Sequence, residues 1–260
     1  MTDSDQIAAG IDHVLRRIAQ AADAAGRDPG AVALLLAVKT RSDAEVLAAL
    51  RVLAERLPAG ARPLLGHNRV QELVAAGPAL LGSPGAPVPA HEMHVIGPLQ
   101  SNKINQALRW ATSVDTVGDA TLATKLDAAV GRRLDAGEGV GPHAADRLDV
   151  LVQVNTSGEA TKSGVDPAHA PDLVAHVAAL PRLRLRGFLT IGAHTEDEAA
   201  VRASFDALRE VRDGALASGL PGTEDARELS MGMSGDLETA IACGATTVRL
   251  GTAVFGPRPA

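Results

Sequence analysis

The sequence predicts an eight-stranded α/β barrel, (β/α)₈, with one extra helix at its N-terminal end. Three observations support this fold class: a length of 260 residues, eight short apolar runs, and amphipathic segments between those runs. A barrel of this kind usually takes ~250 residues. Parallel strands are buried on both faces and therefore appear as continuous apolar runs, and eight of them close into a barrel. An open, doubly wound parallel sheet is the alternative.

The chain begins with a helical pattern, in which Ile7, Ile11, Val14 and Ile18 recur on one face. The apolar runs that follow are expected to be strands, at residues 31–38, 63–65, 93–96, 113–117, 150–154, 185–191, 229–233 and 247–254. The amphipathic segments are expected to be helices, at residues 43–57, 69–81, 100–110, 119–134, 168–180, 196–218 and 236–243. Regular alternation of strands and helices indicates a parallel sheet.

Two segments rich in proline and glycine, residues 82–90 and 137–145, interrupt this alternation. Because the alternation resumes after each, we expect both to be surface loops and not domain linkers. The sequence stops a few residues after the eighth expected strand, at Ala260. We therefore expect one domain over residues 1–260.

The composition narrows the class of protein. It is 46% hydrophobic and 22% charged, as in globular proteins, and its net charge of -6 argues against a nucleic-acid or anionic membrane partner. The single cysteine, Cys243, excludes an internal disulfide and fits a reducing compartment. The N-terminal segment lacks the pattern of a secretory signal, and no apolar run reaches the ~18 residues that cross a bilayer. We expect a cytoplasmic protein.

A lysine ends the first expected strand. Functional groups of α/β barrels collect at the carboxyl ends of the strands, and Lys39 directly follows the run AVALLLAV. Partial burial there favours the neutral amine, which forms Schiff bases with aldehydes. The alternative is a lysine that extends its amine to solvent. Arginine would serve that purpose equally well, and this arginine-rich chain has only three other lysines, Lys103, Lys125 and Lys162.

Segments of small residues follow the seventh and eighth expected strands, where barrels often bind phosphate. Ser234 and Gly235 lie in a turn before a helix, whose N–H groups can receive an anion; an ordinary helix cap by Ser234 or Asp236 is the alternative. Gly251 permits close approach of a ligand to the backbone, and Thr252 adds a hydroxyl. Together the two segments predict a phosphate site.

Several other polar residues have two readings. Arg249 lies in an apolar run, so it needs either a structural salt bridge or a ligand. His91 and His94 do not have the spacing of a helical zinc motif, and no metal site is predicted. Lys162 lies in a polar, glycine-containing loop and is expected to be solvated, while Lys103 either caps a helix or contacts a ligand.

At these positions the sequence resembles the YggS/PROSC-type pyridoxal phosphate homeostasis proteins, which share the barrel of the alanine racemase class. The similarity runs in order along nearly the whole chain. Its most specific part is SMGMSGD followed by VRLGTAVFG. The matching segments are residues 34–40, 66–73, 94–103, 114–116, 152–164, 185–192, 228–241 and 248–256.

The resemblance implies that pyridoxal 5′-phosphate (PLP) is the cofactor and that Lys39 holds it as a Schiff base. The family's second motif usually reads Gly-Glu-Asn, whereas this chain has His67 in place of the glutamate, and Pro98 stands where histidine is common. The other implied contacts are Ser234, Gly235, Gly251 and Thr252 around the phosphate, Arg249 facing the pyridine nitrogen, and Asn68, His94 and Met231 near the ring.

The resemblance also implies a role in PLP homeostasis more than in fast catalysis. An arginine cannot accept the proton of the pyridine nitrogen, so Arg249 weakens the electron sink on which PLP enzymes depend. Racemases of this class use a tyrosine and a second domain, and this sequence contains no tyrosine. We expect a monomeric carrier whose partners are PLP and apo PLP-dependent enzymes. The alternatives are a low-activity amino-acid racemase or lyase, and an aldolase-like barrel without PLP.

Overall fold

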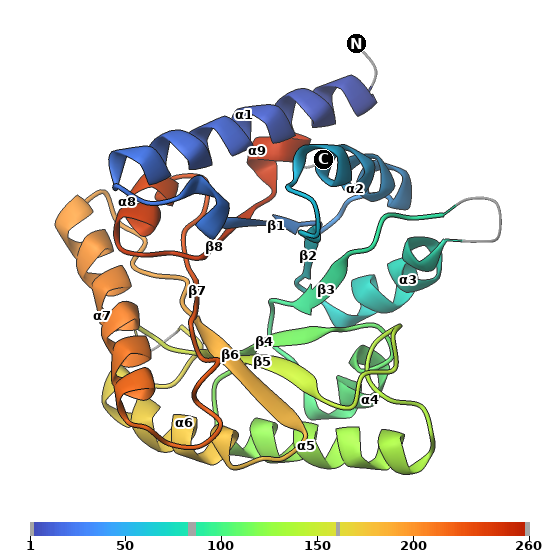
Figure 1. Cartoon of the computed structure of the whole chain (residues 1–260), viewed down its shortest axis with the longest axis vertical. Helices are drawn as coiled ribbons and strands as arrows, with labels where there is room; N and C mark the ends of the chain where they lie inside the picture. Colours follow the sequence, from blue (N-terminus) through green and yellow to red (C-terminus); the bar gives the residue numbers. More distant parts are fainter. Residues whose placement is uncertain (1–2, 83–86, 160–161, 258–260) are drawn as a thin grey trace.

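The computed structural model describes residues 3–82, 87–159 and 162–257. Its strands pair in parallel, each with the next in sequence, and β8 pairs with β1 to close a barrel (Figure 1). This closure confirms the (β/α)₈ prediction and excludes the open sheet. The strands are β1 (Ala33–Ala37), β2 (Leu64–His67), β3 (Glu92–Val95), β4 (Ser113–Val117), β5 (Leu148–Gln153), β6 (Leu183–Leu189), β7 (Glu228–Ser230) and β8 (Thr247–Leu250).

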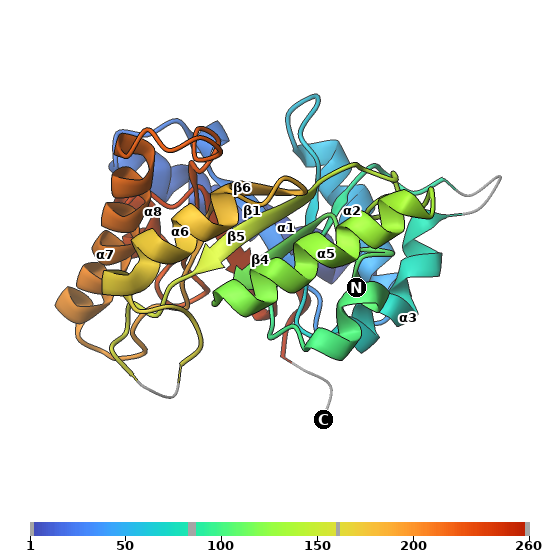
Figure 2. The same cartoon turned by 90° about the horizontal axis from the view of Figure 1, so that it is seen from below.

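Helices surround the barrel, and Figure 2 shows α5 and α6 on the outside of β4, β5 and β6. The α-helices are α1 (Asp3–Ala24), α2 (Asp43–Arg56), α3 (Val70–Leu81), α4 (Ile104–Ala107), α5 (Ala120–Asp135), α6 (Ala170–Ala178), α7 (Glu198–Ala217), α8 (Leu237–Ala242) and α9 (Thr252–Phe255). Three short 3₁₀ helices are η1 (Pro29–Ala31), η2 (Ser101–Lys103) and η3 (Pro167–His169).

Some elements are shorter than the sequence patterns indicate. The eighth strand ends at Leu250, because Gly251 leaves the extended conformation with a ψ of -67° and the next residues form α9. The helix expected over 100–110 is divided into η2 and the four-residue α4. The loop expected at 82–90 lies partly outside the described residues. The loop expected at 137–145 carries an isolated antiparallel bridge between Val140 and Ala145.

Capping side chains determine where helices begin after the strands. Ser42 and Glu45 form a capping box at the start of α2, so the chain enters this helix soon after Lys39. Asp119 accepts the N–H of Leu122 at the start of α5, with a distance of 2.8 Å. Each such cap contributes about 0.5–2 kcal/mol to stability. The caps thus keep the loops at the carboxyl ends of β1 and β4 short.

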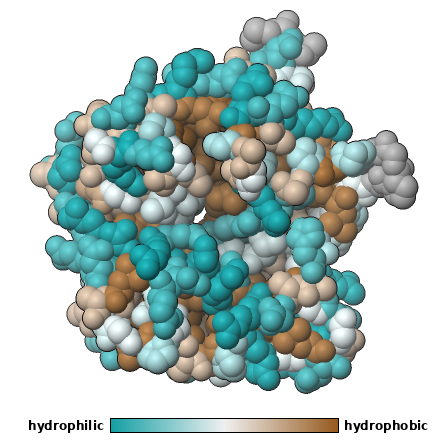
Figure 3. All heavy atoms as spheres, in the orientation of Figure 1, coloured by the Kyte–Doolittle hydropathy of each residue, from teal (hydrophilic) through white to brown (hydrophobic). Residues whose placement is uncertain are grey.

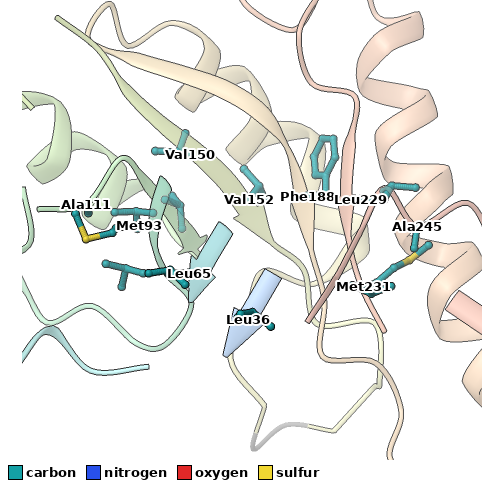
Figure 4. Close-up of a cluster of buried hydrophobic side chains, with 14 of the residues drawn as sticks. Leu36, Leu65, Met93, Ala111, Val150, Val152, Phe188, Leu229, Met231 and Ala245 are labelled. Atoms are coloured by element: carbon teal, nitrogen blue, oxygen red, sulfur yellow. The ribbon is translucent and has the colours of Figure 1, made fainter. Parts of the chain in front are cut away.

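The hydrophobic core fills the layer between strands and helices, where side chains such as Leu65, Val152 and Phe188 are completely buried (Figure 4). The extra N-terminal helix belongs to this core. Figure 1 shows α1 lying across α9, and a Cβ at Gly10 would collide with the backbone of Val254. The N-terminal helix that the sequence predicts therefore packs against α9.

On the face shown in Figure 3, hydrophobic residues lie in patches between hydrophilic ones. The exposed large hydrophobic side chains among the described residues are Leu81, Ile191 and Leu220. Ile191 follows β6 and is 42% exposed at the carboxyl end of the barrel. Over the described ranges, no helix is both long enough and apolar enough to span a membrane.

Candidate functional site

A cavity of about 300 Å³ opens at the carboxyl ends of the strands. Small-molecule sites usually have volumes of ~300–1,000 Å³, and functional groups of α/β barrels lie at this end. The cavity is therefore the candidate functional site. The predicted site residues that line it are Lys39, Asn68, Ser234, Arg249, Gly251 and Thr252.

A groove of about 360 Å³ between α6 and α7 is a weaker candidate. Its lining is mostly apolar, with Pro171, Val174 and Val211, and Glu210 is its one titratable side chain. The groove lies on the outer helices and not at the strand ends. It lacks the combination of amine, guanidinium and hydroxyl groups that the barrel cavity has.

Lys39 lies two residues after the end of β1 and is half-buried. Its amine has no hydrogen bond or ion pair with any residue that the structure describes, and it lines the cavity. The next residue, Thr40, has a φ of 62°, which β-branched residues rarely adopt. The Thr40 hydroxyl donates to the carbonyl oxygen of Lys39 at 2.6 Å. Backbone strain of this kind is typical of functional sites.

Arg249 is buried beside the cavity and held by backbone groups. Its guanidinium donates to the carbonyl oxygen and hydroxyl of Ser230, at 2.6 and 3.0 Å, and to the carbonyl oxygen of Thr190, at 2.8 Å. Burial lowers the pKa of Arg249 to about 10, while the carboxylates of Asp115 and Asp236 act in the opposite direction. No carboxylate within the described ranges lies at ion-pair distance, so the salt-bridge reading is wrong. The guanidinium is charged at neutral pH and fixed in place.

His94 lies one layer deeper than the sequence interpretation placed it. Side chains alternate along a strand, so His94 faces the same side as Ile96, which lines the cavity, but two residues further down. Its Nδ1 is 2.9 Å from a carboxylate oxygen of Asp115, and the Ser113 hydroxyl donates to Asp115 at 2.6 Å. Burial lowers the pKa of His94, but Asp115 and Glu92 together raise it to about 10. His94 is a buried cation beneath the cavity and does not line it.

Met231 does not line the cavity either. Ser230 faces Arg249, so alternation turns Met231 to the opposite, helix-covered side, where it is fully buried in the core (Figure 4). The structure therefore gives no support to the ring contact that the resemblance implies for Met231. Met233, which follows the end of β7, lines the cavity instead.

The loop after β7 and the start of α9 form one edge of the cavity. The hydroxyls of Ser234 and Thr252 and the backbone N–H groups of Ser234, Gly235 and Thr252 have no partner in the part of the chain that the structure describes. Arg17 of α1 donates to the Ser234 carbonyl oxygen at 3.2 Å and supports this loop. Hydroxyl and N–H groups without partners are the donors that a phosphate needs.

Two neighbours complete this edge. Gly235 borders an adjoining hollow together with Ser234 and does not line the main cavity. Asp236 stands at the first position before α8, but its side chain accepts the N–H of Met233 and does not cap the helix. At Gly251, a Cβ would lie 2.8 Å from the carbonyl oxygen of Ala37, so only glycine fits without a shift.

His67, the residue that departs from the family motif, lies behind the cavity wall. It is 2% exposed, and alternation turns it away from the side on which Asn68 lines the cavity. Burial, with the charges of His91 and His94, lowers the pKa of His67 to about 4, so the ring is neutral. Its Nε2 has no partner in the described ranges. The histidine that replaces the family's glutamate thus lies behind β2, on the side away from the cavity. Asn68 still lines the cavity.

The structure shows the surroundings of Lys162 and Lys103, the two other lysines considered in the sequence analysis. Lys162 is not solvated as expected: its amine lies 2.7 Å from a Glu159 oxygen and donates to the carbonyl oxygen of Gly192 at 2.9 Å. Lys103 precedes α4 without a side-chain capping bond and lines a neighbouring cavity. Among the described residues, no group of three or more His, Cys, Asp or Glu side chains is placed to hold a metal ion.

Sequence reasoning misses five lining residues: Ala37, Arg41, Ile96, Ile191 and Met233. Ile96 had a signal, because it ends the third expected strand on the same face as His94. Arg41 follows Lys39 by two residues, and its guanidinium lies 5.3 Å from the centre of the Phe255 ring. No local pattern indicates that Ile191 turns into the cavity.

These features define a (β/α)₈-barrel protein with a lysine just after β1 and, after β7 and β8, an edge of hydrogen-bond donors without partners among the described residues. Residues 9–259 match the family model described as the alanine racemase N-terminal domain. The pyridoxal phosphate homeostasis protein of Pseudomonas aeruginosa is 41% identical over 255 residues, which cover 97% of this chain and 96% of that protein. The chain belongs to the family of pyridoxal phosphate homeostasis proteins.

Solved structures agree with the barrel. An unknown protein from Bifidobacterium adolescentis is 41% identical, with a TM-score of 0.82 and coverage of 97% of this chain and 95% of that one. PipY of Synechococcus elongatus, solved with PLP bound, is 28% identical, with a TM-score of 0.71 and coverage of 92% and 100%. The fold of this chain is thus shared over nearly its whole length.

Proposed function

We propose that this protein binds PLP as a Schiff base on Lys39 and acts in intracellular PLP homeostasis without fast catalytic turnover. The observation that carries the proposal is the single cavity lined by the Lys39 amine, the Arg249 guanidinium and the hydroxyls of Ser234 and Thr252. The comparisons support it, since the Pseudomonas aeruginosa relative is named a pyridoxal phosphate homeostasis protein and PipY was solved with PLP bound.

The residues fit the cofactor group by group. The Lys39 amine, which has no partner in the described part of the chain, suits an aldehyde carbon. The donors of Ser234, Gly235 and Thr252, equally without partners there, suit a phosphate. Arg249 lines the same cavity and suits an acceptor such as a ring nitrogen. PLP itself supplies the aldehyde and an electron-accepting ring.

The same residues argue against fast amino-acid chemistry. Arg249 carries a proton that it does not give up at neutral pH, so it cannot stabilise a protonated pyridine nitrogen as a carboxylate does. The chain contains no tyrosine to oppose Lys39 as a second acid/base. A positioned acid or base contributes about 10²–10⁴-fold to a rate. The chain's residues bind and orient the cofactor and offer little for bond cleavage.

Three further statements belong to this proposal. The recipients of the cofactor are apo PLP-dependent enzymes, because a carrier without turnover must release what it binds. The protein works as a monomer in the cytoplasm, in agreement with its single cysteine and acidic net charge. A low-activity amino-acid racemase or lyase is the second candidate, favoured by the match to the alanine racemase domain model.

Transfer and turnover measured side by side test the proposal. PLP-loaded protein is mixed with an apo-aminotransferase, whose recovered activity reports transfer, and the same preparation is assayed on a panel of amino acids. We expect recovery of the aminotransferase and a kcat below the ordinary enzyme range of ~1–10³ s⁻¹ on every amino acid. Lys39→Ala, treated identically, is the control. It cannot hold PLP as a Schiff base at this position, so it should carry and transfer no covalently bound PLP. A kcat within the ordinary range on any amino acid would contradict the proposal and favour a racemase or lyase.

A further inference from the structure

A second cavity, of about 610 Å³, adjoins the first and shares Lys39 and Asn68 with it. Its wall consists of the first turn of α3 and the segment that leads from β3 into η2. Three cationic side chains line it: Lys39, Arg69 and Lys103. Among the described residues of the lining, Glu72 is the one carboxylate, so with all three cations counted as charged the formal charge of the wall is three minus one, or +2.

This charge is not neutralised by neighbouring protein groups. Over the described ranges, the side chains of Arg69 and Lys103 make no hydrogen bond or ion pair, and Arg69 precedes α3 without a side-chain cap. One carboxylate oxygen of Glu72 is buried without a partner. The twelve-residue α3 also begins at this cavity, so its first N–H groups and the positive end of its dipole lie here. Cations without partners in a concave surface raise the local concentration of anions.

We propose that this second cavity, defined by Arg69, Lys103 and the first turn of α3, docks a phosphate monoester beside Lys39. In the function proposed above, on which this inference rests, the monoester is PLP before capture or after release. A phosphate monoester carries about -1.5 to -2 charges at neutral pH and so matches a wall of +2. A single carboxylate would leave part of that charge uncompensated.

The arrangement places anion-binding groups on two sides of one amine. The first cavity offers Ser234 and Thr252, the second offers Arg69 and Lys103, and Lys39 lines both. A cofactor docked in the second cavity therefore lies within the same hollow as the amine that captures it. The docking site should act on the rate of loading, because its charges attract the free cofactor.

The rate of PLP capture by the apo protein tests this site. The double variant Arg69→Gln/Lys103→Gln is compared with wild type by stopped-flow absorbance. The matched control is Arg16→Gln/Arg51→Gln, which removes two exposed charges from α1 and α2. We expect the cavity variant to load about 10-fold more slowly at low salt, since charged clefts raise on-rates by ~10–10³-fold. The difference should shrink as salt screens the charges. Equal rates for the cavity variant and the control would overturn the site.

Binding of inorganic phosphate gives a readout that does not need capture. By isothermal titration we expect the wild-type apo protein to have two phosphate sites, of which Arg69→Gln/Lys103→Gln loses one and Ser234→Ala/Thr252→Ala the other. A single site that only the second variant abolishes, or displacement of phosphate by alanine at equal concentration, would contradict the proposal. Circular dichroism checks that each variant folds.

The two proposals fail differently. If wild-type protein does not capture PLP on Lys39, the proposed function is wrong. If it does, and the cavity variant loads like the control, only the docking site is wrong.

Discussion

Replacing Asp115 by asparagine removes the carboxylate that stabilises the buried charge of His94. The pair lies inside the barrel, with side-chain exposures of 8% for His94 and 1% for Asp115 and a separation of 2.9 Å. Two other carboxylates act on His94: an oxygen of Glu92 is 3.6 Å from Nε2, and the charge of the buried Glu228 also interacts with the ring. In Asp115→Asn, the histidine must therefore either stay charged with a distant partner or lose its proton.

The expected cost follows from this burial. Breaking a buried ion pair by removing one partner costs about 3–5 kcal/mol of unfolding free energy. For a protein of this size, each kcal/mol corresponds to roughly 2–4 °C in Tm, so we expect Tm to fall by roughly 6–20 °C. Asp12→Asn serves as the control, because the Asp12–Arg56 pair is about 40% exposed and such pairs contribute ~0–1 kcal/mol.

The assay is urea unfolding of wild type and Asp115→Asn at several pH values. The pKa of His94 in the folded protein is about 10, above its ordinary 6.5, so the folded state binds this proton more tightly than the unfolded state. The stabilisation is therefore complete below pH 6.5 and is lost as the pH rises through about 10. The difference between wild type and variant should shrink over the same range. A difference below about 1 kcal/mol at low pH, or one that does not change with pH, would refute the buried ion pair.

Two further predictions concern the cavity. Ser234→Ala and Thr252→Ala should each weaken the binding of PLP by about 1.5–3 kcal/mol, or roughly 10- to 150-fold. The binding of pyridoxal should weaken much less, because only PLP carries the phosphate. Equal losses of affinity in titrations with both vitamers would show that these residues act on the fold and not on the phosphate. Gly251→Ala should weaken PLP binding, because the new Cβ would lie 2.8 Å from the Ala37 carbonyl oxygen and one of the two groups must move. Unchanged affinity in the same titration would show that this edge does not contact the cofactor.

The barrel could be predicted because its signals are local. The run before Lys39 is apolar at every position, and its end marks the carboxyl end of β1. The segments around Ser234 and Thr252 could be placed at one edge because consecutive barrel strands are neighbours. Arg249 could be recognised as needing partners, since a charge in an apolar run is costly. These features depend on sequence patterns and on strand order alone.

The depth and facing of individual side chains could not be predicted. The resemblance implies that Met231 lies near the ring, whereas β7 ends at Ser230 and the Met231 side chain is buried in the core. His94 needed the register of β3 against its neighbours to show that it lies one layer below the cavity. Lys162 is bound by the carbonyl oxygen of Gly192, on a different loop, and no local pattern reports such a contact.

The identity of the lysine is the central claim, and borohydride labelling tests it most directly. Protein loaded with PLP is reduced with borohydride, digested and mapped by mass spectrometry, with Lys39→Ala as the control. We predict one phosphopyridoxyl group per chain, on Lys39, and none on the variant. Recovery of the label only on Lys103 or Lys162 would contradict the account.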